Sequence, residues 1–152
     1  MIIDEFSTKD ELDRLLYSID KFKLDLYTYS TAELERCLHY QYDIKFNAFI
    51  QKVLEKNNLQ LADDNKVKLE KLLADVAKEV ASIEILELTI AFSPTVRFLN
   101  VLRHWIVENV SKNTVIAIHV DKSVLGGAAI VYRGHYLDLT ISNKLKSFDF
   151  AL

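Results

Sequence analysis

The sequence contains few of the residues that bend or cross-link a chain: three glycines, one proline and one cysteine among 152 residues. The single cysteine, Cys37, excludes an internal disulfide and is typical of a reducing compartment. We expect it to be a small buried apolar side chain rather than a nucleophile. The sequence also lacks an apolar run long enough to cross a bilayer, and its start does not resemble a signal peptide. It therefore predicts no direct membrane insertion, so that any work at a membrane would depend on another protein.

Charge of either sign is also limited. The formal net charge is −3, with 50% of residues hydrophobic and 27% charged, which is typical of a folded globular chain. Residues 1–83 carry 16 acidic and 12 basic side chains, whereas residues 84–152 carry 6 and 7. Neither part has the concentrated basic surface of a nucleic-acid binder, so we expect no nucleic-acid partner.

The residues that could form a catalytic or metal site are scattered along the chain. Asp121 and Asp138 could suggest paired acids, but we expect both to cap backbone N–H groups, Asp121 after a strand and Asp138 before a helix. The segment Leu125-Gly126-Gly127 lacks the lysine and hydroxyl residue of a phosphate loop. None of the histidines lies at a metal-ligand spacing from another histidine or from the cysteine: His39, His104, His119 and His135. The sequence therefore predicts no catalytic residue, no cofactor and no metal.

Amphipathic helices are predicted over the first half of the chain. A capping box at Thr8 begins a helix that runs to about residue 27, and a second capping box at Ser30 begins the next. Asp43 is the point at which this second helix could break, and either Asp63 or Asp64 is expected to cap a third. Apolar side chains recur at three- and four-residue spacing within each segment, which favours a helical bundle.

At Glu84 the spacing of apolar residues changes from 3.6 to 2, which predicts a strand. Ser93 is expected to cap the helix that follows, with Pro94 at its first position and Trp105 on its apolar face. The expected elements are a strand at 85–92, a helix at 93–113, strands at 114–120, 128–133 and 135–139, and a closing helix at 140–148. The predicted fold class is α+β (mixed): an N-terminal helical domain, residues 1–83, then a small β-α-β-β-α domain with a mixed sheet, residues 84–152.

All three glycines lie within nine positions, where we expect the pair to form a bulge or a tight entry into a strand and the third to form a hairpin turn. Residues 84–148 resemble the delta subunit of F-type ATP synthases, the oligomycin-sensitivity-conferring protein family. The chain departs from the family pattern at Leu139, where glycine is usual, and at Thr140, where serine is usual. The residues that carry the resemblance match in order and spacing: Asp121, Ser123, Leu125, Gly126, Gly127, Gly134, Asp138, Thr140 and Leu145.

The resemblance implies a structural connector in the peripheral stalk, with no catalysis of its own. In this family the helical domain grips N-terminal segments of the alpha subunits on the catalytic head, and the C-terminal domain holds the C-terminal helices of subunit b. It implies one copy per complex, bound peripherally at the cytoplasmic face of the cell membrane, in support of proton-driven ATP synthesis. The N-terminal part is shorter than is usual for the family and lacks its usual opening motif.

On the C-terminal domain we expect partner contacts from Phe98, Leu102, Arg103, Trp105 and Lys144. Two other functions stay open at this point. An E-type stalk subunit of V-type or A-type ATPases would have one unbroken, highly charged N-terminal helix, which the predicted helix starts interrupt. A small α/β ligand-binding or enzymatic module is the third alternative.

Overall fold

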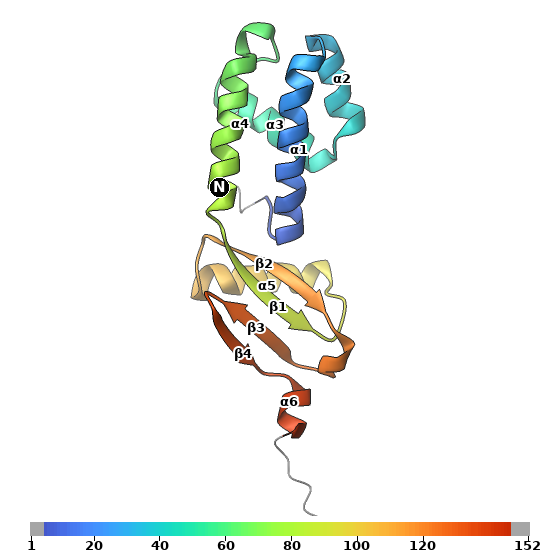
Figure 1. Cartoon of the computed structure of the whole chain (residues 1–152), viewed down its shortest axis with the longest axis vertical. Coiled ribbons are helices and arrows are strands. Elements are labelled where there is room, and N and C mark those ends of the chain that lie inside the picture. The colour runs from blue at the N-terminus through green and yellow to red at the C-terminus, as the bar shows by residue number, and fades with distance from the viewer. Residues whose placement is uncertain (1–4, 147–152) are drawn as a thin grey trace, which may run out of the picture. The chain divides into compact units, whose positions relative to one another are not determined.

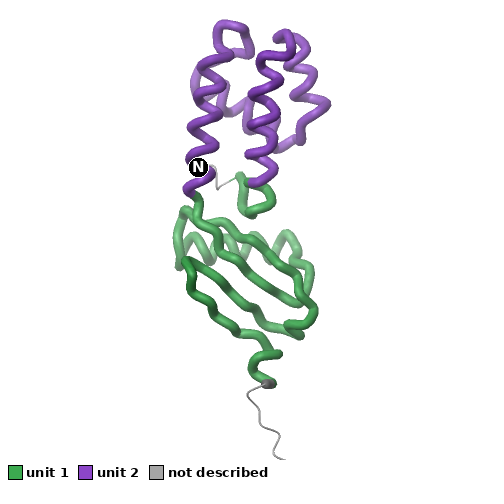
Figure 2. Tube along the Cα trace, in the orientation of Figure 1, with its two compact units in different colours: residues 1–12, 83–152 green, residues 13–82 purple. Residues whose placement is uncertain are grey.

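A computed structural model describes residues 5–146 of the protein (Figure 1). The chain divides into two compact units (Figure 2). One unit is formed by residues 13–82 and is called here the helical unit. The other, called the α/β unit, combines residues 1–12 with residues 83–152. The chain therefore passes from the α/β unit into the helical unit and back again.

Capping side chains mark the starts of helices at Thr8 and at Asp43. Thr8 and Glu11 form the predicted capping box, in which the Glu11 N–H donates to Thr8 Oγ1 at 3.3 Å and the Thr8 N–H donates to Glu11 Oε2 at 3.2 Å. Asp43 Oδ1 accepts the Phe46 N–H at 2.7 Å, so the chain does break there and a new helix begins. The helices are α1 (Lys9–Thr28), α2 (Thr31–Gln41), α3 (Ile44–Lys56) and α4 (Lys66–Ala81).

The predicted cap of the last of these helices is wrong. Asp63 and Asp64 lie inside a 3-10 turn, η2 (Asp63–Asn65), and the helix begins after it with no side-chain cap from Asn65. The Asp63 carboxylate instead pairs with the Lys66 amino group at 2.8 Å. Short polar side chains compete for nearby backbone groups and favour such local turns, which is why an Asp-Asp-Asn run forms the turn rather than a simple cap.

Aromatic residues form the centre of the helical unit. The Phe22 ring is fully buried and meets the rings of Tyr42 and Phe46 edge-on, at centroid distances of 5.7 and 5.8 Å. The Tyr42 hydroxyl donates to the buried carboxylate of Asp25 at 2.6 Å. Burial and this acceptor raise the pKa of Tyr42, so the hydroxyl remains a donor. This hydrogen bond gives the buried Asp25 carboxylate a partner, and burial of the carboxylate without one would cost free energy.

The α/β unit contains a four-stranded sheet in the order β2-β1-β3-β4. Strands β1 and β2 are parallel, and the other neighbours are antiparallel, so the sheet is mixed as predicted. Helix α5 covers one face of the sheet (Figure 1). The elements are β1 (Glu84–Ile90), α5 (Val96–Asn109), β2 (Thr114–Val120), the 3-10 turn η3 (Lys122–Val124), β3 (Ala128–Tyr132), β4 (His135–Asp138) and α6 (Ile141–Lys146). The mixed α+β fold class is confirmed.

The start of α5 differs from the prediction. Thr95, and not Ser93, is the N-cap: its hydroxyl accepts the Phe98 N–H at 3.2 Å. Pro94 lies before the helix and not at its first position. Ser93 and Thr95 both carry a hydroxyl and flank the proline. Thr95 is the one that lies three residues before Phe98, the spacing at which an N-cap side chain accepts a backbone N–H. Trp105 is also not on the apolar face, because 54% of its surface is exposed. The end of the predicted closing helix, residues 147–148, lies outside the described residues.

The segment before α1 belongs to the α/β unit, which the sequence did not predict. Thr8 forms a parallel bridge with Ile116, and the Ile116 N–H donates to the Ser7 carbonyl at 3.3 Å. The Arg103 guanidinium donates to the Ser7 hydroxyl. Phe6 is 4% exposed. These contacts cover the outer edge of β2 with residues that precede it by more than a hundred positions in the sequence.

Candidate functional site

The β3–β4 hairpin has a two-residue turn at Arg133 and Gly134, whose φ angles are 49° and 77°. Positive φ at both central positions is the signature of a type I′ turn, which matches the twist of the strands. The Arg133 guanidinium then reaches Glu84 through bonds of 3.0 and 2.9 Å, and the Tyr132 hydroxyl donates to the same carboxylate at 2.5 Å. The Tyr132 hydroxyl and the Arg133 guanidinium lower the pKa of Glu84. Gly134 therefore serves the turn, and the turn attaches the hairpin to the start of β1.

Asp121 is the cap that its place after a strand predicts. Its carboxylate oxygen Oδ1 accepts the Ser123 N–H at 2.9 Å and begins the turn η3. Hydrogen bonds from Ser123 lower the pKa of this exposed carboxyl, so Asp121 is ionised at neutral pH. An acid that accepts a backbone N–H at a turn has a structural role there, as predicted.

The two glycines after this turn let another segment come close. The Gly126 carbonyl accepts the Ile141 N–H at 3.0 Å. A side chain on Gly127, whose φ is 75°, would overlap the carbonyl oxygen of Leu139. A Cβ on Gly126 would lie 2.7 Å from Ile141 Cδ1. The pair is therefore a tight entry into β3 against which residues 139–141 pack.

The start of α6 corrects the role predicted for Asp138. The N-cap is Thr140, whose hydroxyl accepts the Asn143 N–H at 3.1 Å. Asp138 Oδ1 accepts the Thr140 N–H at 2.9 Å and so orients the capping residue. Thr140 is 5% exposed, and its side chain replaces, with the same capping chemistry, the serine of the family pattern. Because a β-strand ends at Asp138, the cap moves two residues along the chain.

The structure brings most of the signature residues together. The Ser142 hydroxyl donates to the Ser123 carbonyl at 2.7 Å, which joins α6 to η3 directly. We call this group the glycine-pair cluster: Asp121, Ser123, Leu125, Gly126, Gly127, Asp138 and Thr140. Leu145 lies further along the chain, in α6. Gly134 lies at the opposite end of the hairpin. Each polar contact of the cluster described above involves at least one backbone group, so the cluster positions segments.

The residues predicted to contact a partner lie on two elements, α5 and α6, and differ in exposure. Phe98 and Leu102 are partly buried and pack against the core of the α/β unit. Arg103 bonds the N-terminal segment at Ser7. Trp105 is half exposed on α5, and Lys144 is exposed on a different helix, α6.

Helix α5 exposes two further apolar residues that the sequence reasoning missed. Val101 is 65% exposed, and Val96 is 74% exposed. Val101 precedes Trp105 by four residues, so the two share a face one turn apart. That spacing was visible in the sequence, but the burial of the opposite face was needed to show which side faces outward.

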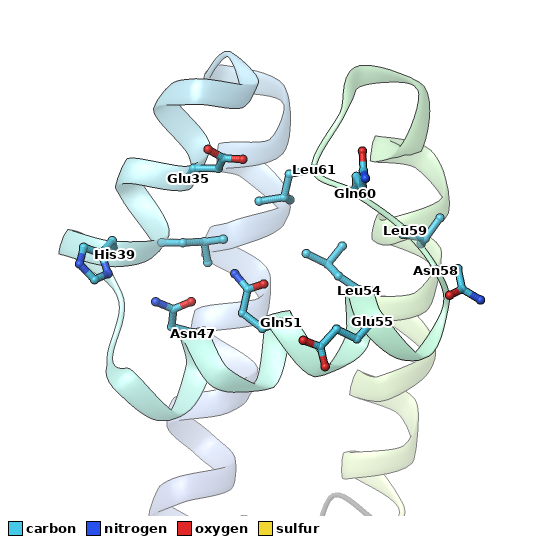
Figure 3. A pocket seen from close by; sticks show the side chains of 11 residues that line it. Glu35, His39, Asn47, Gln51, Leu54, Glu55, Asn58, Leu59, Gln60 and Leu61 are labelled. Atoms are coloured by element: carbon cyan, nitrogen blue, oxygen red, sulfur yellow. The ribbon is translucent and has the colours of Figure 1, made fainter.

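An open groove of about 910 Å³ lies in the helical unit (Figure 3). Helix α2, helix α3 and residues 58–61 form its walls. Leu38 and Leu54 in its lining are 2% and 6% exposed, whereas Leu59 and Leu61 are half-buried. The polar side chains that line it are Glu35, His39, Asn47, Gln51, Glu55, Asn58 and Gln60. The groove combines amides, carboxylates and one imidazole.

Groups for metal binding or membrane spanning are also limited. Across residues 5–146, the structure places no three histidine, cysteine, aspartate or glutamate side chains so that they could hold a metal ion. In the same range, no helix combines the length and the apolar character needed to span a bilayer.

Comparison with known proteins assigns the family. The family model described as ATP synthase delta (OSCP) subunit matches residues 28–152. The ATP synthase subunit delta of Wigglesworthia glossinidia brevipalpis is 23% identical over 141 residues, which is 91% of this chain and 78% of that relative. The subunits of the same name from Thermotoga petrophila and Thermotoga maritima are each 36% identical over 59 residues, or 39% of this chain and 32% of theirs.

A family model that covers most of the chain decides the assignment: the protein belongs to the ATP synthase delta (OSCP) subunit family. The resemblance carried by the glycine-pair cluster is confirmed, and with it the assignment to the F-type ATP synthase and to ATP synthesis. The match begins at residue 28, so α1 lies almost wholly outside it.

Proposed function

We propose that this chain is the non-catalytic connector of the F-type ATP synthase peripheral stalk, one copy joining the catalytic head to subunit b. The α/β unit binds the C-terminal helices of subunit b, and the helical unit binds the alpha subunits of the head. The complex places the chain at the cytoplasmic face of the cell membrane. Family membership and the two-unit organisation support this function.

The observation that carries the proposal is the outward stripe of α5. Val101 and Trp105 are 65% and 54% exposed on a helix whose other face, at Ile106, is 1% exposed. Tryptophan is enriched among the residues that dominate binding energy, and a helix laid along another helix buries such a stripe. The exposed guanidinium of Arg97, one turn before Val101, adds a charge that steers an acidic partner end.

The helical unit offers its own apolar surface for the head. Tyr17 and Leu24 on α1 are 73% and 71% exposed, and their spacing of seven residues puts them on one face. Tyr27 follows on the same side and donates its hydroxyl to Glu70 at 2.6 Å. The unbroken N-terminal helix of a V-type or A-type stalk protein is not supported, because α1 ends at Thr28.

The experiment is calorimetric titration of the full-length chain with a peptide from the C-terminus of the same organism's subunit b. We expect a complex with a negative heat-capacity change, because apolar surface is buried. Trp105→Ala should weaken binding by about tenfold or more. Val67→Ser, which removes an exposed apolar side chain of α4 that belongs to neither proposed surface, should leave it unchanged. Absence of binding, even with the assembled head present, would exclude the proposed function.

A second measurement tests the proposal that the chain has no catalytic activity of its own. The purified chain should not turn over ATP, because Asp121 and Asp138 each accept a backbone N–H at 2.9 Å in a structural role at a turn or helix start. Saturable turnover that disappears in Asp121→Asn or Asp138→Asn would contradict the connector function.

A further inference from the structure

The sheet of the α/β unit has two edge strands, and they differ in length and charge. β4 has four residues and ends at Asp138, whereas β2 has seven, with the sequence TVIAIHV. Five of the seven are β-branched, and the strand contains no lysine, arginine or acidic residue. Such a run, without proline or glycine, is the kind that pairs with copies of itself. Because an edge strand offers a row of backbone N–H and C=O groups for pairing, β2 is the edge that requires protection.

Three residues before α1 protect part of this edge, and we call them the edge cover: Phe6, Ser7 and Thr8. Thr8 forms a parallel bridge with Ile116, whose N–H donates to the Ser7 carbonyl at 3.3 Å. Phe6 and Ile116 are 4% and 2% exposed. The Arg103 guanidinium, on α5, donates to the Ser7 hydroxyl. The edge cover is therefore held by a backbone hydrogen bond, by a buried ring and by a second element of the unit.

The start of α1 limits how far the edge cover reaches along β2. The cover runs parallel to β2, so the next residues to pair with Ile118 and Val120 would be Asp10 and Leu12. Both of these belong to α1, whose backbone groups bond within the helix. The capping box at Thr8 thus ends the edge cover where it begins the helix. The cover pairs with β2 at Ile116 and does not continue to Ile118 or Val120.

The backbone groups of Ile116, Ile118 and Val120 face the same side of β2. Successive residues of a strand direct their N–H and C=O groups to alternate sides. β2 pairs with β1 in one uninterrupted register over its seven residues. Since the Ile116 N–H points to the edge cover and away from β1, the other two also face outward. The same edge therefore contains one position that meets the cover and two that do not.

We propose that the edge cover is an autoinhibitory strand, which prevents the β2 strand of a second copy of this chain from pairing with β2. Two identical strands without charged side chains fit each other in an antiparallel pair about a two-fold axis. The short bridge of the cover blocks that pairing at the buried half of β2. This role is independent of the connector function, because it concerns the isolated chain. It also favours the single copy that the connector requires.

The first test is amide hydrogen exchange by NMR on the full-length wild-type chain. The Ile116 amide should exchange about tenfold more slowly than the Ile118 amide, because both face outward and only the first meets the edge cover. Ser7→Ala, which removes only the hydroxyl that Arg103 binds, should speed exchange at Ile116 and leave Leu88 in the central strand β1 unchanged. Equal rates at Ile116 and Ile118 in the wild type would overturn the proposal, as would an Ile116 rate that Ser7→Ala leaves unchanged.

The second test releases the edge cover with Phe6→Ala and Ser7→Ala together. We expect a concentration-dependent dimer in analytical ultracentrifugation, under conditions in which the wild type is a monomer. The further change Val120→Lys, at a side chain that is 48% exposed, should restore the monomer, because lysine on an edge strand blocks pairing. Phe49→Ala is the matched control, since Phe49 is a buried phenylalanine of the helical unit with 6% exposure. It should remain monomeric.

Three results of the second test would overturn the proposal. A folded double variant that stays monomeric although exchange at Ile116 has risen would show that the open edge does not self-associate. A dimer that Val120→Lys leaves unchanged would not be formed through β2. Dimerisation of Phe49→Ala would assign the association to a general loss of stability. If the double variant does not fold, the exchange rates at Ile116 and Ile118, in the wild type and in Ser7→Ala, decide the question.

Discussion

In the helical unit, helix starts depend on residues a few positions away, whereas the α/β unit adds close contacts between segments that are distant in the sequence. Asp43 caps the N–H of Phe46, three residues later. Gly127 instead lies against the carbonyl of Leu139. The Ile116 N–H donates to the carbonyl of Ser7, which precedes it by more than a hundred positions in the sequence.

The backbone conformation is therefore fixed in two ways in this protein, by helix caps and by glycines at close approaches. A cap stabilises one helix end by a hydrogen bond, and its loss costs about 1 kcal/mol. A glycine at a close approach permits a contact that any side chain would prevent, so its replacement disturbs both segments. We therefore expect substitutions in the glycine-pair cluster to disturb more of the structure than substitutions of helix caps do.

The largest effect should come from the buried aromatic centre of the helical unit. Phe22→Ala should lower the free energy of unfolding by about 3–5 kcal/mol, because Phe22 is 0% exposed and its removal leaves a cavity. Urea denaturation measures this change. Tyr17→Ala on the same helix, at 73% exposure, should stay within about 0.5 kcal/mol of the wild type. Similar losses for both variants would show that the helical unit lacks the specific core described here.

The next largest loss of stability should come from Gly127→Val. We expect a loss of about 1–3 kcal/mol from backbone strain at φ 75°, and the overlap with the Leu139 carbonyl adds to it. Gly134 has a similar φ of 77° but open space around it, so Gly134→Asn, which tolerates this region, should be close to neutral. An unchanged melting curve for Gly127→Val would show that the close approach is not needed.

Asp43→Ala should have a smaller and more local effect. Removal of the cap on α3 should cost about 1 kcal/mol, and Asp43→Asn, which can still accept the Phe46 N–H, should recover most of it. Hydrogen exchange should be faster only in the first turn of α3. Faster exchange in the sheet of the α/β unit would contradict the local role of this cap.

The smallest effect is a pH dependence of the hairpin attachment. The pKa of Glu84 is lowered by the Tyr132 hydroxyl and by Arg133, so its contribution is present above the ordinary value of 4.5 and is lost as the pH falls through the lowered value. Acidification from neutral pH should therefore lower the melting temperature less in Glu84→Gln than in the wild type. Parallel curves for the two proteins would show that Glu84 does not sense pH.

Several local features could be predicted from the sequence because their causes are local. The capping boxes, the change of period at Glu84, the strand at residues 114–120 and the glycine turn all depend on neighbours within a few positions. The prediction was wrong at Ser93 and Asp138, where two nearby polar residues competed for one capping role. Packing of the following segment decided which side chain met the N–H.

The amino-acid sequence by itself determined the order of helices and strands, the mixed fold class and the signature around the glycine pair, because periodicity and turn chemistry are properties of short segments. Only the tertiary structure decided that Ser7 and Thr8 complete the edge of β2. It also decided that Trp105 faces outward and that Leu125 presents its side chain at positive φ. These features depend on which distant surfaces meet, and that depends on the packing of the whole unit and not on any short run of residues.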